Sequence, residues 1–119
     1  SEMCIRDRYI NVMFGGKLWY HPKLPVNRTR GVDHQVWLVK EQRNIWVNNY
    51  HSDCIYEEGL ASCFEPLAID RENHVVEAYG SDEMKILALQ WHPERRFETA
   101  NAYEETRKII LDFIQKYVK

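Results

Sequence analysis

Two stretches of the chain place apolar side chains at the spacing of an α-helix. In residues 5–14 the apolar positions recur every three or four residues, and Gly15-Gly16 follows. We predict a short helix that ends at these glycines, because glycine adopts the left-handed conformation of a helix C-terminus at low steric cost. Residues 101–118 predict a longer helix, whose apolar stripe would pack against a sheet. The stripe is formed by Tyr103, Thr106, Ile110, Phe113, Ile114 and Tyr117.

The segment that precedes this long helix predicts a series of short β-strands. Four stretches rich in apolar residues are separated by polar sequences: 34–39, 44–49, 64–70 and 74–79. The last two predict a hairpin across "DREN", and Pro66 predicts that the first strand of this hairpin lies at a sheet edge. The stretch "ILALQ" at 86–90 is nearly all apolar, which favours a central strand that is covered on both faces and suited to parallel pairing.

The composition narrows the class of protein. The 119 residues predict a single domain, 1–119, and a hydrophobic fraction of 45% with four tryptophans is enough for one core. The formal net charge is −2, from 16 basic and 18 acidic residues, which gives no reason to expect nucleic acid or an anionic membrane surface as a partner. No apolar run approaches the roughly 18 residues of a membrane span, so we expect no membrane segment.

The cysteines and histidines outside the motifs argue against structural cross-links and metal sites. Cys4, Cys54 and Cys63 form no close pair, so we expect no disulfide framework and a reducing, cytoplasmic location. We expect Cys54 and Cys63 to be buried structural thiols. Three histidines lack the spacing of metal ligands: His21, His34 and His74. We therefore expect neither a metal nor a cofactor.

Candidate chemistry follows directly after "ILALQ". His92 comes at the carboxyl end of this strand, where open α/β sheets bind their ligands. Glu94 could accept a hydrogen bond from the imidazole, which would fix the tautomer and stabilise the protonated ring. By itself, a His-x-Glu sequence is more often a surface pair than a catalytic pair.

Three motifs in a fixed order carry a family resemblance. "QWHPE" at 90–94 resembles the His/Glu signature of class I glutamine amidotransferase domains. "VNNYH" at 47–51 resembles the "VNSYH" segment of the gamma-glutamyl hydrolase branch, which includes enzymes that cleave gamma-glutamyl-aminobutyrate. "INVMFGGKL" at 10–18 resembles the "INV-x-x-GG-x-L" that follows the nucleophile of that branch. The resemblance covers the chain from Ile10 to the C-terminal helix.

The resemblance implies a fold and a partner. The fold is α/β: the C-terminal half of a class I glutamine amidotransferase-like domain, which is flavodoxin-like with a mostly parallel sheet and carries an antiparallel hairpin. The ligand is a small gamma-glutamyl molecule. Without upstream strands, apolar surface of the sheet would stay uncovered, and we expect the chain to self-associate through it.

The resemblance also implies a reaction. A cysteine attacks a gamma-glutamyl amide, a thioester forms, and water releases glutamate. His92 would be the base and Glu94 would orient it. Asn49, Tyr50 and His51 would hold the glutamyl end of the substrate. Asn49 replaces the usual serine, and the sequence after His51 also departs from the aminobutyrate-type enzymes, so another gamma-glutamyl amide remains open as the substrate.

Cys4 is the positional candidate for the nucleophile, since it lies seven residues before Asn11 as the family pattern requires. Its surroundings depart from the pattern G-x-C-x-G, because Glu2 and Arg6 replace the glycines that a strained nucleophile elbow needs. Only three residues precede Cys4. We therefore expect residues 1–9 to be a foreign leader joined to a half-domain, with a divergent elbow in an intact short protein as the alternative.

Three functions are consistent with these observations. The first is a gamma-glutamyl hydrolase of the amidotransferase superfamily. The second is a glutaminase half that delivers ammonia to a synthase. The third is a non-catalytic fragment or binding module, which the altered elbow favours.

Overall fold

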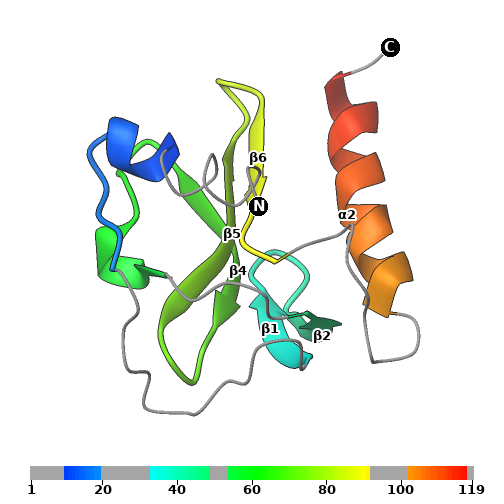
Figure 1. Cartoon of the computed structure of the whole chain (residues 1–119). Helices are drawn as coiled ribbons and strands as arrows, with labels where there is room; N and C mark the ends of the chain where they lie inside the picture. The colour runs from blue at the N-terminus through cyan, green and yellow to red at the C-terminus, as the bar shows by residue number, and fades with distance from the viewer. Residues whose placement is uncertain (1–9, 20–32, 49–53, 92–101, 118–119) are drawn as a thin grey trace.

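The computed structural model describes residues 10–19, 33–48, 54–91 and 102–117. Its strands form one six-stranded sheet in the order β2-β1-β4-β5-β3, with β6 also paired to β5 (Figure 1). The strands are β1 (His34–Leu38), β2 (Arg43–Val47), β3 (Ile55–Tyr56), β4 (Glu65–Asp70), β5 (Val75–Ser81) and β6 (Ile86–Leu89). The helical segments are a turn at residues 10–13, the 3-10 helix η1 (Glu57–Gly59) and the helix α2 (Ala102–Tyr117).

Two hairpins contain the four strands predicted at 34–39, 44–49, 64–70 and 74–79, and the second is the hairpin predicted across "DREN". β1 and β2 pair antiparallel around "KEQR", and β4 and β5 pair antiparallel around "DREN". In the second turn, the Asp70 carboxylate accepts hydrogen bonds from the backbone N–H of Glu72 at 3.2 Å and from Nδ2 of Asn73 at 2.9 Å. A short acidic side chain that bonds to the following backbone stabilises a turn at this position.

β5 is the most enclosed strand of the described sheet. It pairs with β4 along one edge, and with β3 and β6 along the other. Two irregularities interrupt the β4–β5 ladder, which runs from Pro66↔Tyr79 to Ala68↔Ala78 and then to Ile69↔Val76. The first leaves an extra residue on β4, at position 67, and the second leaves an extra residue on β5, at position 77. The two bulges compensate, so the β4–β5 pairing has the same register at both ends of the ladder.

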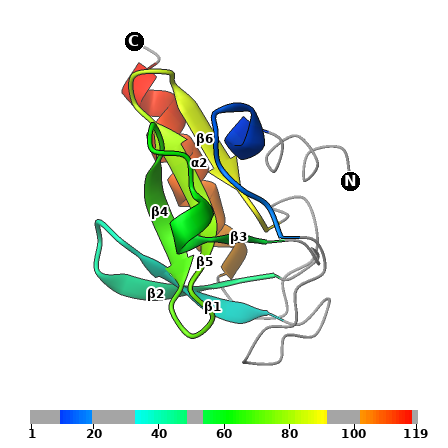
Figure 2. The ribbon, with the colours of Figure 1, turned by 90° about the vertical axis from the view of Figure 1, so that its left-hand side faces the viewer.

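Apolar residues cover both faces of the sheet around β5. On the face toward α2, one cluster contains Val36, Leu38, Ile45, Val47, Ala68, Ala78, Leu89 and Trp91. On the opposite face, a second cluster contains Ile55, Ala61, Phe64, Val76, Tyr79 and Ala88. Figures 1 and 2 show α2 on one side of β4, β5 and β6, with residues 10–19 and the segment around η1 on the other side.

Helix α2 confirms the helix predicted at 101–118, but its packed face differs from the predicted stripe. Thr106 is buried, and Ile110 and Phe113 are partly buried, as expected. Tyr103 and Ile114 are 52% and 46% exposed, so their predicted burial is wrong. The other packed residues are Ala102, which is buried, and Ile109, which packs against the α2-facing cluster. The positions 102, 106, 109, 110 and 113 still follow helical spacing. The packed face of α2 is rotated about the helix axis by about one residue relative to the predicted stripe.

Two predictions about strand positions are wrong. β4 is an internal strand, since it pairs with both β1 and β5. Pro66 is tolerated because it lies at the start of β4, where the β1 ladder has ended and a bulge follows. β6 pairs with β5 in antiparallel fashion, like every strand pair among the described residues. Its continuous apolar sequence reflects the two covered faces, because Ala88 belongs to one cluster and Leu89 to the other.

Among the described residues, no helix has the length and apolar character that crossing a membrane requires.

The contact that fixes α2 on the sheet is a buried hydrogen bond. Nε1 of Trp91 donates to Oγ1 of Thr106 at 3.1 Å, and both residues are 1% exposed. Because a buried polar group without a partner is unfavourable, this bond favours the placement of α2 that brings Thr106 to Trp91.

We predict that Thr106→Val lowers the free energy of unfolding by about 1–3 kcal/mol, because it keeps the shape of the side chain but leaves the indole N–H of Trp91 without its acceptor. In a Trp91→Phe background the same substitution should cost less, since that N–H is gone. Urea unfolding of the four proteins in this cycle measures both quantities. Equal losses in the two backgrounds would contradict the assignment.

Candidate functional site

The site residues predicted from the sequence all lie outside the described residues: Cys4, Asn49, Tyr50, His51, His92 and Glu94. The roles assigned to them therefore stay predictions. The structure does describe residues 10–19 of the first motif, residues 47–48 and 54 beside the predicted substrate residues, and residues 90–91 directly before His92. These flanking residues show what positions the motifs.

The segments that lead to the "VNNYH" and "QWHPE" motifs both lie beside β5. The N–H of Gln90 donates to the backbone carbonyl of Glu77 at 2.7 Å, so the chain that continues to His92 leaves the sheet beside Glu77. Nε2 of His34 lies 3.5 Å from Oε1 of the same Glu77. His34 in turn pairs with Val47, the last residue of β2 and the first of the "VNNYH" motif. Two motifs that are about 40 residues apart in sequence thus begin at one part of the sheet.

The residue before His92 is held firmly. Trp91 is 1% exposed, packs in the cluster that faces α2, and donates its indole N–H to Thr106. The role predicted for His92 would require its position to be held to within about 0.5 Å of the productive geometry, and a large buried neighbour in the chain provides such a fixed point.

The chain after the "VNNYH" motif returns to the sheet at Cys54. Two backbone hydrogen bonds join Cys54 to Trp19, at 2.9 and 3.0 Å, and form an isolated antiparallel bridge. Cys54 is buried, as expected, but Cys63 is exposed, so its predicted burial is wrong. Cys63 lies in a turn before β4, and the neighbouring Phe64 fills the core in its place.

Asn11 explains the asparagine of the "INVMFGGKL" motif. Its side chain is completely buried, and its Nδ2 donates to the carbonyls of Gly59 at 3.0 Å and of Lys17 at 3.2 Å. Its Oδ1 accepts the backbone N–H of Ala61 at 2.7 Å. One amide side chain therefore joins the helical turn at 10–13 to the segment around η1, and no aliphatic side chain could replace these bonds.

The two glycines of the motif end the helical turn, as predicted. The N–H of Gly15 donates to the carbonyl of Val12 at 3.1 Å, and the N–H of Gly16 donates to the carbonyl of Asn11 at 2.9 Å. This pair of bonds is the Schellman arrangement, which requires a left-handed residue, and Gly15 has φ 95°. A β-carbon on Gly16 would collide with the side chain of Asn11. The glycines and the asparagine thus act as one unit.

Gly59 is a further close contact, which the sequence analysis does not identify. A β-carbon at this position would collide with the ring of Trp19. Trp19 also meets Tyr56 edge to face, with ring centroids 4.8 Å apart. The sequence gives no signal for these contacts, because the partners are about 40 residues apart and no pattern links them.

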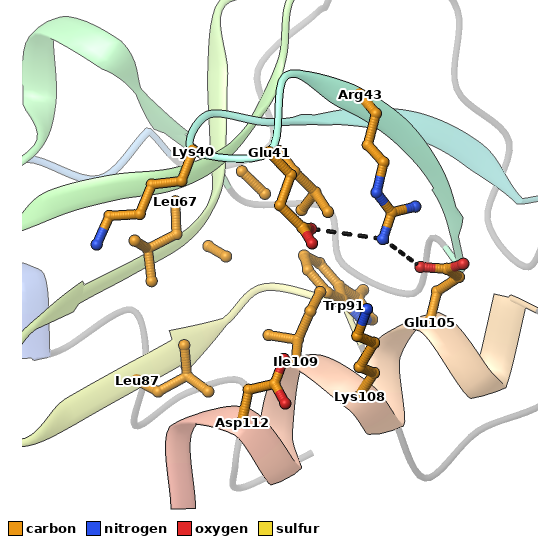
Figure 3. A pocket seen from close by; sticks show the side chains of 13 residues that line it. Lys40, Glu41, Arg43, Leu67, Leu87, Trp91, Glu105, Lys108, Ile109 and Asp112 are labelled. Carbon is orange, nitrogen blue, oxygen red and sulfur yellow. Dashed lines mark hydrogen bonds and ion pairs between the residues drawn. The ribbon is translucent and has the colours of Figure 1, made fainter. Parts of the chain in front are cut away.

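A pocket of about 180 Å³ lies between α2 and the sheet. Figure 3 shows its apolar side chains, among them Leu67, Leu87 and Ile109, with charged side chains around them. Arg43 donates to Glu105 at 2.7 Å, and this hydrogen bond raises the pKa of the guanidinium. The described lining contains no cysteine or histidine, so the pocket does not suggest a catalytic centre.

A larger and more polar cleft, of about 660 Å³, runs beside β1 and the turn between β4 and β5. Its lining includes His34 and Asp70. The side chains of His34, Asp70 and Glu77 come together here, and they form a cluster that sequence spacing did not reveal. A signal was present, since a glutamate in the apolar stretch "HVVEAY" is unusual unless it has partners.

We predict that Asn11→Ala lowers the free energy of unfolding by at least about 2 kcal/mol, because it leaves a buried N–H and buried carbonyls without partners. Val12→Ala is the matched control on the same helical turn, at a side chain that is 42% exposed. It should change stability by less than about 0.5 kcal/mol. Chemical denaturation followed by tryptophan fluorescence tests both, and equal effects would refute the role given to Asn11.

Comparisons with known proteins agree with this architecture. The profile of the peptidase C26 family matches residues 25–94. A search of curated proteins gives no match. Among solved structures, a protein described as a GMP synthase subunit from Thermoplasma acidophilum is 19% identical, with a TM-score of 0.65 over 92% of this chain and 54% of that chain. This likeness confirms the expected α/β fold class, and the chain spans about half the length of that relative. The mostly parallel sheet that the resemblance implies is not found among the described residues, where every strand pair is antiparallel. Because the C26 profile covers more than half of its residues, the chain belongs to the peptidase C26 family.

Proposed function

We propose that the protein represented by this chain hydrolyses a gamma-glutamyl amide bond through a Cys-His-Glu triad. The observation that carries the proposal is the extent of the family match. Residues 25–94 include the "VNNYH" segment as well as His92 and Glu94. The substrate-binding segment and the base with its orienting carboxylate therefore belong to the part of the chain that is characteristic of the family.

The proposed reaction has two halves. His92 takes the proton of the cysteine thiol, and the thiolate sulfur bonds to the carbonyl carbon of the gamma-glutamyl amide. The carbon–nitrogen bond then breaks as His92 returns the proton to the leaving amine, which leaves a thioester. In the second half, His92 takes a proton from water, the hydroxyl oxygen attacks the thioester carbon, and glutamate leaves as the thiol is restored. Glu94 holds the imidazole in the required tautomer.

The described scaffold supports these roles by fixing where the motifs begin. Trp91 is anchored through Thr106, and Gln90 is anchored through the carbonyl of Glu77. Asn48, which leads into the substrate segment, is fully buried. Positions that are fixed before the substrate binds lower the entropic cost of reaching the reactive geometry.

Cys4 is the proposed nucleophile by its position in the motif order. It lies outside both the family match and the described residues. Further along the chain, the helical turn at 10–13 is anchored by Asn11, Gly15 and Gly16. Self-association through uncovered sheet surface likewise stays a prediction.

A second candidate function is supported by one observation. The structural relative is described as belonging to a GMP synthase. This favours a role in which the amide is that of glutamine and the released ammonia passes to a synthase. The two functions differ in their partner: the second requires a synthase that copurifies and forms its product at the expense of glutamine.

We predict that the full-length protein releases glutamate from a gamma-glutamyl amide and that His92→Ala reduces the rate by at least about 10²-fold, because general base catalysis is lost. His74→Ala is the matched control, since His74 is an exposed histidine bonded to Glu57. It should leave the rate unchanged. Activity in His92→Ala equal to that of the control would refute the triad.

A second prediction concerns the thiol of Cys4. If it is the nucleophile, alkylation by iodoacetamide should reveal a pKa below the ordinary value of about 8.5, and His92→Ala should abolish the effect. Cys63 is exposed and serves as the internal reference, and Cys54 is buried and should react slowly. Peptide mapping gives the rate at each site. Reaction of Cys4 at the same rate and pH dependence as Cys63 would favour a non-catalytic chain.

A further inference from the structure

Three side chains from three strands meet beside the polar cleft. His34 begins β1, Asp70 ends β4, and Glu77 lies in β5. One imidazole nitrogen and one oxygen from each carboxylate all lie within 4.8 Å of one another. Within the cluster, Nε2 of His34 lies 3.5 Å from Oε1 of Glu77.

The bulge in β5 explains why Glu77 takes part. It is the extra residue of the ladder between Ala68↔Ala78 and Ile69↔Val76, so the usual alternation does not set its direction. Its backbone carbonyl is held by the N–H of Gln90. This bond fixes the backbone from which the carboxylate extends.

Burial makes the charge of this cluster important. Glu77 is 0% exposed and Asp70 is 4% exposed, and the side chain of His34 is 15% exposed. Two ionised carboxylates this close repel one another strongly away from water. A divalent cation beside a neutral imidazole would interact favourably with both carboxylates.

The cleft offers a route for a cation to reach the cluster. His34 and Asp70 line it, and so do the carboxylates of Asp33 and Glu72. The guanidinium of Arg71 also lines it and lies 3.8 Å from the ring centroid of Trp37. The described lining thus contains more carboxylates than cationic groups, which favours entry of positive ions.

The donor set indicates the kind of ion. Ligand atoms bind zinc-like ions at about 2.0–2.2 Å, so neighbouring ligands of one ion lie about 3–4 Å apart. The His34–Glu77 pair already has this spacing, and the cluster as a whole would contract around a bound ion. The carboxylate of Asp70 is oriented by Nδ2 of Asn73, at 2.9 Å, as metal-binding carboxylates usually are. One imidazole with two carboxylates suits Mn²⁺, Fe²⁺ or Zn²⁺ better than Ca²⁺.

From this geometry we propose that His34, Asp70 and Glu77 form a binding site for a divalent first-row transition metal. The ion would join β1, β4 and β5 at the point where the segments toward the two motifs leave the sheet. The proposal does not depend on the proposed function, because it concerns binding and stability alone.

Titration with Mn²⁺, followed by the electron paramagnetic resonance signal of the free ion, tests the proposal. Mn²⁺ is the probe because cysteine thiols bind it weakly. The whole 119-residue chain is used, without a histidine tag and after removal of metals by a chelator. We expect saturation at one ion per chain. Each of His34→Gln, Asp70→Asn and Glu77→Gln should weaken binding by more than about ten-fold. Glu72→Gln, at an exposed carboxylate of the same cleft, should leave the affinity within about two-fold.

Thermal unfolding with and without Mn²⁺ keeps the test decisive if Glu77→Gln fails to fold. The ion should raise the melting temperature of the wild-type chain and of Glu72→Gln, but not of folded His34→Gln or Asp70→Asn. The proposal is overturned if the wild-type chain binds no Mn²⁺ below about 1 mM, the weak limit of functional cation sites. It is equally overturned if His34→Gln and Asp70→Asn bind Mn²⁺ as the wild-type chain does.

Discussion

The enclosure of β5 is the constraint on which the rest of the described structure depends. A strand that pairs along both edges and is covered on both faces requires a helix on one side and a packed segment on the other. Helix α2 meets the first need, through the cluster around Trp91. Residues 10–19 and the segment around η1 meet the second, through the cluster around Tyr79. Three of the described strands, β3, β4 and β6, thus pair with β5 directly.

The same strand organises the candidate site. The bulge at Glu77 turns one carboxylate toward His34 while the backbone carbonyl holds Gln90. The chain therefore leaves the sheet toward "VNNYH" and toward His92 from neighbouring points, although the two motifs are distant in sequence.

The sequence predicts local features well in this protein. Apolar stretches and polar turns identify the strands of both hairpins and the pairing of the second, and the helical spacing identifies α2. Gly15 identifies the end of the first helical turn, because a helix end of this kind depends on a local feature, a residue in the left-handed conformation. What the sequence misses depends on partners far along the chain. Pro66 suggested an edge because the end of the β1 ladder cannot be read from a sequence, and the cluster of Glu77 with His34 arises from a bulge that no periodicity reveals.

Native-state hydrogen exchange of the backbone amides tests most directly the claim that the motif segments are fixed to β5. We expect the amides of Gln90 and Ala61, which donate to Glu77 and Asn11, to be protected to the same degree as those of β5. Both should open only when the core unfolds. Slow exchange within β5 together with rapid exchange at Gln90 and Ala61 would show that these segments are not fixed to the strand.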